Sequence, residues 1–407
     1  MEGLVNEDTV NAFRISRRRV LTGFGATAFA LAVPAIESTP ALAASKSDRD
    51  KTPEVTGFLY VNGNTPTANT IAGFARHRDG TLSLLTGSPF TLGGAGTGAA
   101  LGSQGAIQLS ADKRFLLAVD SGSNGIAVLR ILRDGRLQAV SGSPFPSGGS
   151  APVSIAVHEN LVYVANAGAG GSNYTGFLLR SDGSLQPLAG STVAIPDGTG
   201  VGDVLFDRTG KHLIGIQVTT SVIDSFTVGR NGLLTAAPGS PFAAQAPGPF
   251  GSIFGRHGPR RLFVSNAHGG TLAGSVSAFA VADNGSLSAL AGSPYPDLQT
   301  APCWVSLSPD GRYLFTANAG SDSISSYRVA AGGSLSLVGS TALRGGPGLG
   351  TFDEALDPTG RFLYQVDGNK AELSVLAVDG GNLSELPSSP ISLALPAGAA
   401  PFGIAII

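Results

Sequence analysis

The sequence of 407 residues has little charge, one tryptophan, one cysteine and five histidines. Because Cys303 is the only cysteine, an internal disulfide framework and a multi-cysteine zinc site are both excluded. Charged residues make up 13% of the chain and the net charge is −2, so no strong field attracts nucleic acid or an anionic membrane. We therefore expect no nucleic-acid partner.

Glycine and proline, in contrast, are abundant, with 58 and 25 copies. Together with the low charge, they favour an all-β protein of short strands and tight turns. A short motif, Gly-Ser-Pro-Phe in its clearest form, recurs at steps of 47 to 55 residues, which is typical of a repeat architecture. Its seven strong and weak copies begin at Gly87, Gly142, Gly190, Gly239, Gly292, Gly339 and Ser388.

Residues 301–340 show the organisation of one repeat. Short β-rich runs at 305–307, 313–317, 324–329 and 335–338 are separated by tight turns. Four such strands form an antiparallel meander, which is the blade of a propeller. The sequence therefore predicts a single seven-bladed β-propeller. We expect each motif copy to end an outer strand and to begin the passage to the next blade.

The two ends of the repeat array complement each other. The first unit begins with a second-type strand, residues 58–61, and lacks a first strand, whereas residues 400–407 match the first strand at 301–307. We expect the C-terminal strand to complete the N-terminal blade, because this closure removes the edges of an open array. Residues 404–407 should then be buried.

Residues 1–43 have the pattern of a secretory signal. Ser16–Leu21 reads Ser-Arg-Arg-Arg-Val-Leu, an uncharged run of 17 residues follows, and the segment ends in a small-x-small pattern. The arginines resemble the twin-arginine type of signal, and the uncharged run is too short for a stable membrane span. We expect export to the periplasm or the cell exterior, with 44–55 as a flexible lead-in and 56–407 as the propeller.

Three stretches carry a family resemblance: Leu161–Asn166 (Leu-Val-Tyr-Val-Ala-Asn), Ser308–Leu314 (Ser-Pro-Asp-Gly-Arg-Tyr-Leu) and Ala301–Trp304 (Ala-Pro-Cys-Trp). With the sevenfold repeat, they make the chain resemble the lactonase-like propellers, a family that includes 6-phosphogluconolactonase and carboxymuconate cyclase relatives. The resemblance implies a monomeric hydrolase that acts on a small sugar or ring lactone. The catalytic members resemble one another in His- and Arg-bearing segments before inner strands. Residues 201–204 and 351–354 here lack both, so no family catalytic residue is carried over.

Candidate site residues occupy one repeat slot at the starts of the inner strands. Asp203 and Asp353 should face each other across the channel, with Glu354 beside the second and Trp304 in the neighbouring unit. The carboxylates suit general acid/base chemistry, and the indole suits a wall against a sugar-like ring. We expect no cofactor, although oxygen ligands would also suit Ca²⁺. The alternatives are that each Asp accepts backbone N–H bonds and that Trp304 packs between blades.

Further candidates follow the second strands. Asn166, Asn266 and Asn318 end three of these strands at one equivalent position, and His268 lies two residues beyond one of them. The amides suit substrate binding and the imidazole suits a general base, whereas the alternatives are turn-capping Asn side chains and a solvated His. Two functions remain open: the lactone hydrolase, and a non-catalytic exported propeller that binds a glycan, peptide or protein partner.

Overall fold

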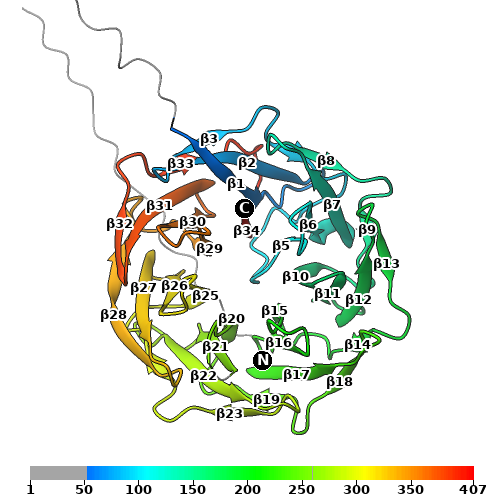
Figure 1. Cartoon of the computed structure of the whole chain (residues 1–407), viewed down its shortest axis with the longest axis vertical. Coiled ribbons are helices and arrows are strands. Elements are labelled where there is room, and N and C mark those ends of the chain that lie inside the picture. The colour runs from blue at the N-terminus through cyan, green and yellow to red at the C-terminus, as the bar shows by residue number, and fades with distance from the viewer. Residues whose placement is uncertain (1–52, 259) are drawn as a thin grey trace, which may run out of the picture. The chain divides into compact units, whose positions relative to one another are not determined.

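The computed structural model describes residues 53–258 and 260–407, so the expected export signal lies outside the described residues. The described chain forms seven antiparallel sheets arranged in a ring about a central axis (Figure 1). The predicted all-β, seven-bladed propeller is thereby confirmed. We number the blades 1 to 7 in chain order and give the strands of each from the inner to the outer side.

Blade 1 contains β34 (Ile404–Ile406), β1 (Val55–Asn62), β2 (Thr70–His77), β3 (Leu82–Leu84) and β4 (Phe90–Thr91). Blade 2 contains β5 (Ile107–Leu109), β6 (Phe115–Asp120), β7 (Gly125–Ile131), β8 (Leu137–Ala139) and β9 (Phe145–Pro146), with the short 3-10 helix η1 (Ser121–Ser123) between β6 and β7. Blade 3 contains β10 (Pro152–His158), β11 (Leu161–Asn166), β12 (Asn173–Leu179), β13 (Leu185–Pro187) and β14 (Val193–Ala194).

Blade 4 contains β15 (Val201–Phe206), β16 (His212–Gln217), β17 (Val222–Val228), β18 (Leu234–Ala236) and β19 (Phe242–Ala243). Blade 5 contains β20 (Pro249–Phe254), β21 (Arg261–Asn266), β22 (Ser275–Val281), β23 (Leu287–Ala289) and β24 (Tyr295–Pro296). Blade 6 contains β25 (Pro302–Leu307), β26 (Tyr313–Asn318), β27 (Ser323–Val329) and β28 (Leu335–Ala342). Blade 7 contains β29 (Thr351–Leu356), β30 (Phe362–Asp367), β31 (Glu372–Asp379), β32 (Asn382–Glu385) and β33 (Ile391–Ser392).

The ring closes as the two ends of the sequence predict. Strand β34 pairs antiparallel with β1, and its Ile404 is buried, whereas Ile406 and Ile407 are half-buried. Arg76 of β2 fixes this closure, because its Nη2 donates to the Ile407 carbonyl oxygen at 3.1 Å and its Nη1 lies 3.2 Å from Asp357 Oδ2. The buried Arg76–Asp357 pair thus joins blade 1 to blade 7 at the C-terminal strand.

The recurring Gly-Ser-Pro motif lies inside the outer strand, which corrects the expectation that it ends this strand. In blade 1, for example, β3 and β4 flank the motif and both pair with β2. Such an excursion would leave a backbone N–H of the third strand unpaired. The motif serine supplies the missing acceptor, since Ser88 Oγ accepts from the Gly73 N–H at 2.9 Å. The same bond recurs at Ser143, Ser191, Ser240, Ser293 and Ser389, while blade 6 has the continuous strand β28.

The hydrophobic core lies between neighbouring blades and positions the inner strands around the axis. Second and third strands bury their side chains against the next blade, as Val61 of blade 1 does with Tyr364 and Val366 of blade 7. Each inner strand lines the central channel, and its channel-facing edge has no partner strand in its own blade (Figure 1). In the part of the chain that the structure describes, no helix is long and apolar enough to cross a membrane.

Candidate functional site

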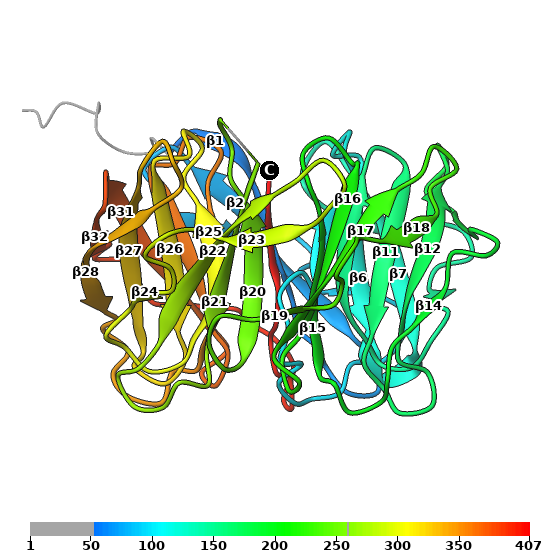
Figure 2. The ribbon, with the colours of Figure 1, turned by 90° about the horizontal axis from the view of Figure 1, so that it is seen from below.

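The central channel has two mouths, which we name after the ends of the inner strands. The N-terminal mouth is where the inner strands begin, and the C-terminal mouth is where they end; Figure 2 shows β34 running along the axis to the chain's C-terminus at the second of these. The sequence places its candidate residues at the N-terminal mouth. The two mouths differ in what fills them.

Four aromatic rings close the N-terminal mouth. Trp304 lies at the centre of this aromatic plug, and its indole Nε1 donates to the Ser103 carbonyl oxygen at 2.7 Å. Trp304 is 2% exposed, so it is not a wall that a substrate could reach from this mouth. The structure shows Trp304 packed against other aromatic rings, which is the alternative to a substrate-binding wall. Its ring contacts, with centroids 5.0 to 5.4 Å away, are Phe250, Phe352 and Phe402.

A chain segment, residues 101–105, crosses the channel under this plug and is called here the channel strap. Gln104 is its central residue and bonds the edges of two inner strands: its Nε2 donates to the Ser252 carbonyl oxygen at 3.1 Å, and its Oε1 accepts from the Val305 N–H at 3.0 Å. A Cβ on Gly251 would clash with Gln104 Oε1, so this glycine provides the room for the strap. The strap thus ties blade 2 to blades 5 and 6.

Asp203 lies in β15 and is 2% exposed. Its Oδ2 accepts from the Ser252 N–H at 3.0 Å and from Ser252 Oγ at 2.6 Å, and its Oδ1 accepts from Ser154 Oγ at 3.3 Å. Burial raises the pKa of Asp203 to about 7, although these hydrogen bonds favour the charged form. Asp203 therefore links three consecutive blades and can still gain a proton near neutral pH.

Asp353 and Glu354 are adjacent in β29, and the charge of Asp353 affects the pKa of Glu354. Asp353 Oδ1 accepts from the Glu354 N–H at 2.9 Å. Its pKa is raised to about 7, mainly by burial and in addition by the charge of Asp203, so these two carboxyl groups act on each other. Burial, together with the charge of Asp353, raises the pKa of Glu354 to about 8. Each negative charge therefore disfavours the next one.

Glu354 is the carboxyl group with an unused oxygen. Its Oε1 accepts from Ser306 Oγ of the preceding blade at 2.8 Å. Its Oε2 is buried and has no hydrogen-bond partner among the residues that the structure describes. A buried polar atom without a partner costs stability, and in native proteins it calls for a specific explanation.

Glu354 also lines a cavity of 460 Å³ that opens at the C-terminal mouth. Arg256 contributes to the same cavity, and its Nη2 donates to the Leu307 carbonyl oxygen at 3.4 Å. Partial burial and the charge of Arg208 lower the pKa of Arg256, because both disfavour its positive charge. Ile253 and Ile406 give the cavity apolar walls. Glu354, Arg256 and two isoleucines thus line one cavity that is large enough for a small molecule.

The three candidate Asn side chains are buried and engaged within their own blades. Asn266 Nδ2 donates to Ser275 Oγ at 3.0 Å and to Ser277 Oγ at 2.9 Å. Asn166 and Asn318 make similar bonds across the turn that follows their second strands. The three amides therefore stabilise the turn within their own blade, which is the alternative to substrate binding. His268 is exposed, packs beside Gly248 and does not join the channel carboxyl groups.

Several residues of the site were missed by sequence reasoning. Arg256 and Ser306 carry no local motif, and Gln104 lies in a segment that does not repeat. One sequence signal could have predicted the aromatic plug. In three units, the residue just before the candidate slot is phenylalanine, and these three residues are the phenylalanines of the plug.

No group of three or more His, Cys, Asp or Glu residues lies close enough together to hold a metal ion within residues 53–258 and 260–407. The carboxyl groups of Asp203, Asp353 and Glu354 therefore do not form a ligand cluster.

Comparison with known proteins finds a family match over part of the chain and a shared fold with several solved structures. Residues 253–401 match the family described as Lactonase, 7-bladed beta-propeller. The comparison with curated protein sequences finds no match. Among solved structures, the fold is similar to that of the periplasmic gluconolactonase of Pseudomonas aeruginosa, with 21% identity, a TM-score of 0.67, and coverage of 86% of this chain and 99% of the other.

Two further structures show the same fold. A candidate 6-phosphogluconolactonase of Bacteroides uniformis is 20% identical, with a TM-score of 0.70 and coverage of 86% of this chain and 99% of the other. A protein from Lactobacillus plantarum is 21% identical, with a TM-score of 0.68 and coverage of 87% of this chain and all (100%) of the other. At these identities, the likeness establishes the propeller fold.

Proposed function

We propose that the protein hydrolyses a small sugar or ring lactone at the C-terminal mouth of its channel, which the match of residues 253–401 to the lactonase family of seven-bladed propellers supports. One observation carries this proposal: Glu354 Oε2 is a buried carboxyl oxygen without a hydrogen-bond partner in the described chain, and Glu354 is one of the residues that line an open cavity. A general base needs a free lone pair and a pKa near the working pH.

The residues of the cavity can be assigned to the steps of lactone opening. Ser306 holds one oxygen of the Glu354 carboxylate, so that the other is left for a water molecule. Glu354 takes a proton from this water as its oxygen bonds to the lactone carbonyl carbon, and Arg256 stabilises the developing oxyanion. The ring C–O bond then breaks, and Glu354 returns the proton to the leaving ring oxygen. The product is a hydroxy acid, and no further reactant is required.

The burial of the carboxyl groups sets the expected pH dependence. Glu354 acts as a base only when it is deprotonated, and its pKa is about 8. Enzymatic turnover should therefore rise with pH through about 8, after subtraction of the spontaneous hydrolysis of the lactone. The charge of Asp353 helps to keep the proton on Glu354, and the charge of Asp203 in turn raises the pKa of Asp353.

The decisive experiment measures proton release from a panel of sugar and ring lactones by the full chain, with and without Ca²⁺. We expect Glu354→Gln to lower turnover by about 100-fold or more, the usual range for a general base, without a loss of melting temperature. Glu159→Gln, at an exposed carboxylate that does not line the cavity of Glu354, is the matched control. Turnover that survives in Glu354→Gln would refute this role.

Export is the second part of the proposal. The Ser-Arg-Arg-Arg-Val-Leu segment at Ser16–Leu21 supports a twin-arginine-type signal that delivers the propeller to the periplasm or the cell exterior. Replacing Arg17 and Arg18 by Lys should retain the protein in the cytoplasm, which cell fractionation measures. Unchanged export in this double variant would contradict the assignment.

A second candidate function is a non-catalytic propeller that binds a glycan, peptide or protein partner. It is favoured by the closed N-terminal mouth, where Trp304 and the three Asn side chains have internal partners. A well-folded protein that turns over no lactone of the panel would make this the better assignment.

A further inference from the structure

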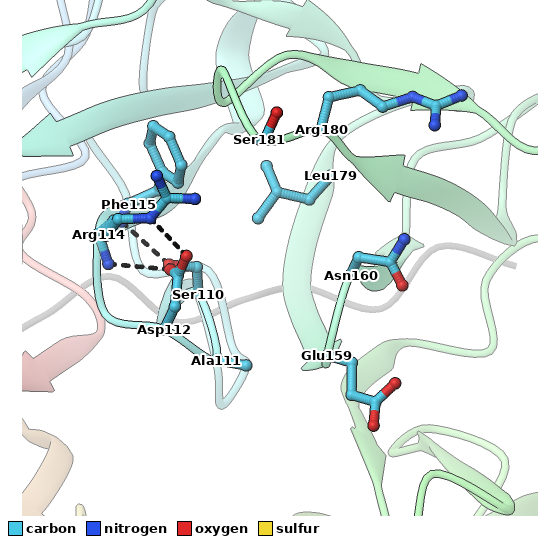
Figure 3. A pocket seen from close by; sticks show the side chains of 10 residues that line it. All are labelled: Ser110, Ala111, Asp112, Arg114, Phe115, Glu159, Asn160, Leu179, Arg180 and Ser181. Carbon is cyan, nitrogen blue, oxygen red and sulfur yellow. Dashed lines mark hydrogen bonds and ion pairs between the residues drawn. The ribbon is translucent and has the colours of Figure 1, made fainter.

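Two grooves of similar size lie between neighbouring blades at equivalent positions. One, between blades 2 and 3, has a volume of 660 Å³ and is shown in Figure 3; the other, between blades 5 and 6, has a volume of 680 Å³. Each is lined by the turn between the first and second strands of one blade and by the end of the third strand of the next. Because the repeat makes the backbones alike, a difference in side chains between the grooves is informative.

The groove between blades 2 and 3, the neutral groove, balances its charges. It holds two acids, Asp112 and Glu159, and two bases, Arg114 and Arg180. Figure 3 shows Arg114 turned onto Asp112, and the Nε–Oδ2 distance is 2.5 Å. Its formal charge is therefore zero, and nothing in it selects for a charged ligand.

The groove between blades 5 and 6, the cationic groove, is lined by four arginines and one acid. Four positive charges and one negative charge leave +3, in a chain whose net charge is −2. Only one of the four has an ion-pair partner among the described residues, since Arg312 Nε lies 2.6 Å from Asp310 Oδ2. The other three arginines are Arg256, Arg261 and Arg328.

Two of the unpaired cations, Arg256 and Arg261, are held in place by backbone carbonyl groups. Arg261 Nε donates to the Gly332 carbonyl oxygen at 3.0 Å, which leaves other N–H groups of its guanidinium for a ligand. The groove has an apolar side, formed by the half-buried Val329 at the end of β27 and by the exposed Ala330 and Ala331. Like charges gathered without counterions repel each other, and a site of this kind is relieved by an anion. An apolar side next to the cations adds room for the body of an organic molecule.

We propose that the cationic groove binds a small organic oxyanion, whose charged head lies among the arginines and whose apolar body rests on Val329, Ala330 and Ala331. A carboxylate and a phosphate monoester share this chemistry, because both accept paired N–H donors from a guanidinium. The groove is a site separate from Glu354, although Arg256 borders both cavities. It does not depend on lactone hydrolysis.

The test titrates the full chain with hexanoate, hexyl phosphate and hexanol, and follows binding by calorimetry at low salt and again at 0.3 M salt. We expect one or both anions to bind, hexanol not to bind, and the affinity to fall as salt increases. The Arg312→Ala/Arg328→Ala double variant should bind at least about tenfold more weakly. The anion that binds more tightly identifies the head group.

The matched control changes the neutral groove. Arg114→Ala/Arg180→Ala removes two arginines from it and should leave anion affinity unchanged. Arg312 and Arg328 are exposed, so their truncation should preserve the melting temperature, and Arg312→Lys/Arg328→Lys should restore part of the affinity through charge alone. Equal binding of hexanol, or equal loss in both double variants, would overturn the proposal.

The outcomes also separate this site from the proposed function. Glu354→Gln should retain full anion affinity, because Glu354 does not line the cationic groove. A protein that binds the anions but hydrolyses no lactone would keep this inference and lose the proposed function. A protein that hydrolyses lactones but binds neither anion would do the reverse.

Discussion

The two mouths of the channel are built from the same inner strands, yet they have opposite chemistry. At the N-terminal mouth, aromatic rings pack together and fill the space, as Trp304 shows with its indole bonded to Ser103. At the C-terminal mouth, Glu354 and Arg256 border an open cavity, and Glu354 Oε2 has no hydrogen-bond partner in the described chain. One end of the channel is thus filled by packed side chains, and the other end keeps a cavity.

The difference shows how a repeat protein acquires a site. Each blade presents an equivalent inner-strand edge to the channel, and residues outside the repeat determine which of these edges are covered. The channel strap covers the N-terminal mouth by bonding Ser252 and Val305 through Gln104. No corresponding segment of the described chain lines the cavity at the C-terminal mouth. Stability and function are therefore assigned to opposite ends of the same strands.

The strongest test of this comparison is Trp304→Ala. Truncation removes the central ring of the aromatic plug and leaves the Ser103 carbonyl oxygen without its donor. We expect the free energy of unfolding to fall by about 3–5 kcal/mol, as for other buried aromatic residues. Chemical denaturation measures it. If the variant keeps its stability but loses turnover of a lactone, Trp304 contacts substrate and the comparison fails.

The pH dependence of stability is the next test. Glu354 has a pKa of about 8 in the folded protein, whereas a glutamate titrates near 4.3 in an unfolded chain. Between these values, the folded state holds a proton that the unfolded state releases, so stability falls as pH rises. The loss is about 1.4 kcal/mol per pH unit for each such group.

Glu354→Gln removes one of these groups, so the fall in unfolding free energy between pH 5 and 8 should become shallower by about that slope. Asp203 and Asp353, with pKa values of about 7, contribute in the same direction up to that pH, as do the buried Asp120, Asp297 and Asp367. Denaturation curves at several pH values measure the slope. The same slope in the variant and the parent protein would show that Glu354 is not buried in its neutral form.

A smaller effect is expected for Gln104→Ala in the channel strap. The change leaves the Ser252 carbonyl and the Val305 N–H without their partner, which costs about 1–3 kcal/mol when both stay buried. Gln138→Ala, at an exposed position of β8, is the control and should change stability by less than about 0.5 kcal/mol. Equal stability of the two variants would mean that the strap does not hold the mouth closed.

The smallest effect is expected for His268→Ala. The side chain is exposed and lies outside the channel, so stability should change by less than about 0.5 kcal/mol and lactone turnover should stay the same. A large loss of turnover in a folded variant would restore His268 as a general base. It would also move the site back to the N-terminal mouth.

Parts of the site could be predicted from the sequence because the repeat aligns its own blades. The slot alignment singled out Asp203 and Asp353, and the charge of one does raise the pKa of the other. The alignment did not show the role of the motif serine, because its partner is a backbone N–H on another strand, as Gly73 is for Ser88. It also did not indicate which mouth is open.

The sequence by itself determined the number of blades and the closure of the ring. Both follow from local properties, namely the period of the motif, the turn dipeptides and the match between residues 400–407 and an inner strand. The tertiary structure decided which polar groups find partners. Gln104 meets Val305 from 201 residues away, and Glu354 Oε2 meets no polar atom of the described chain. Such contacts depend on segments that only the closed ring brings together, so no local pattern could reveal them.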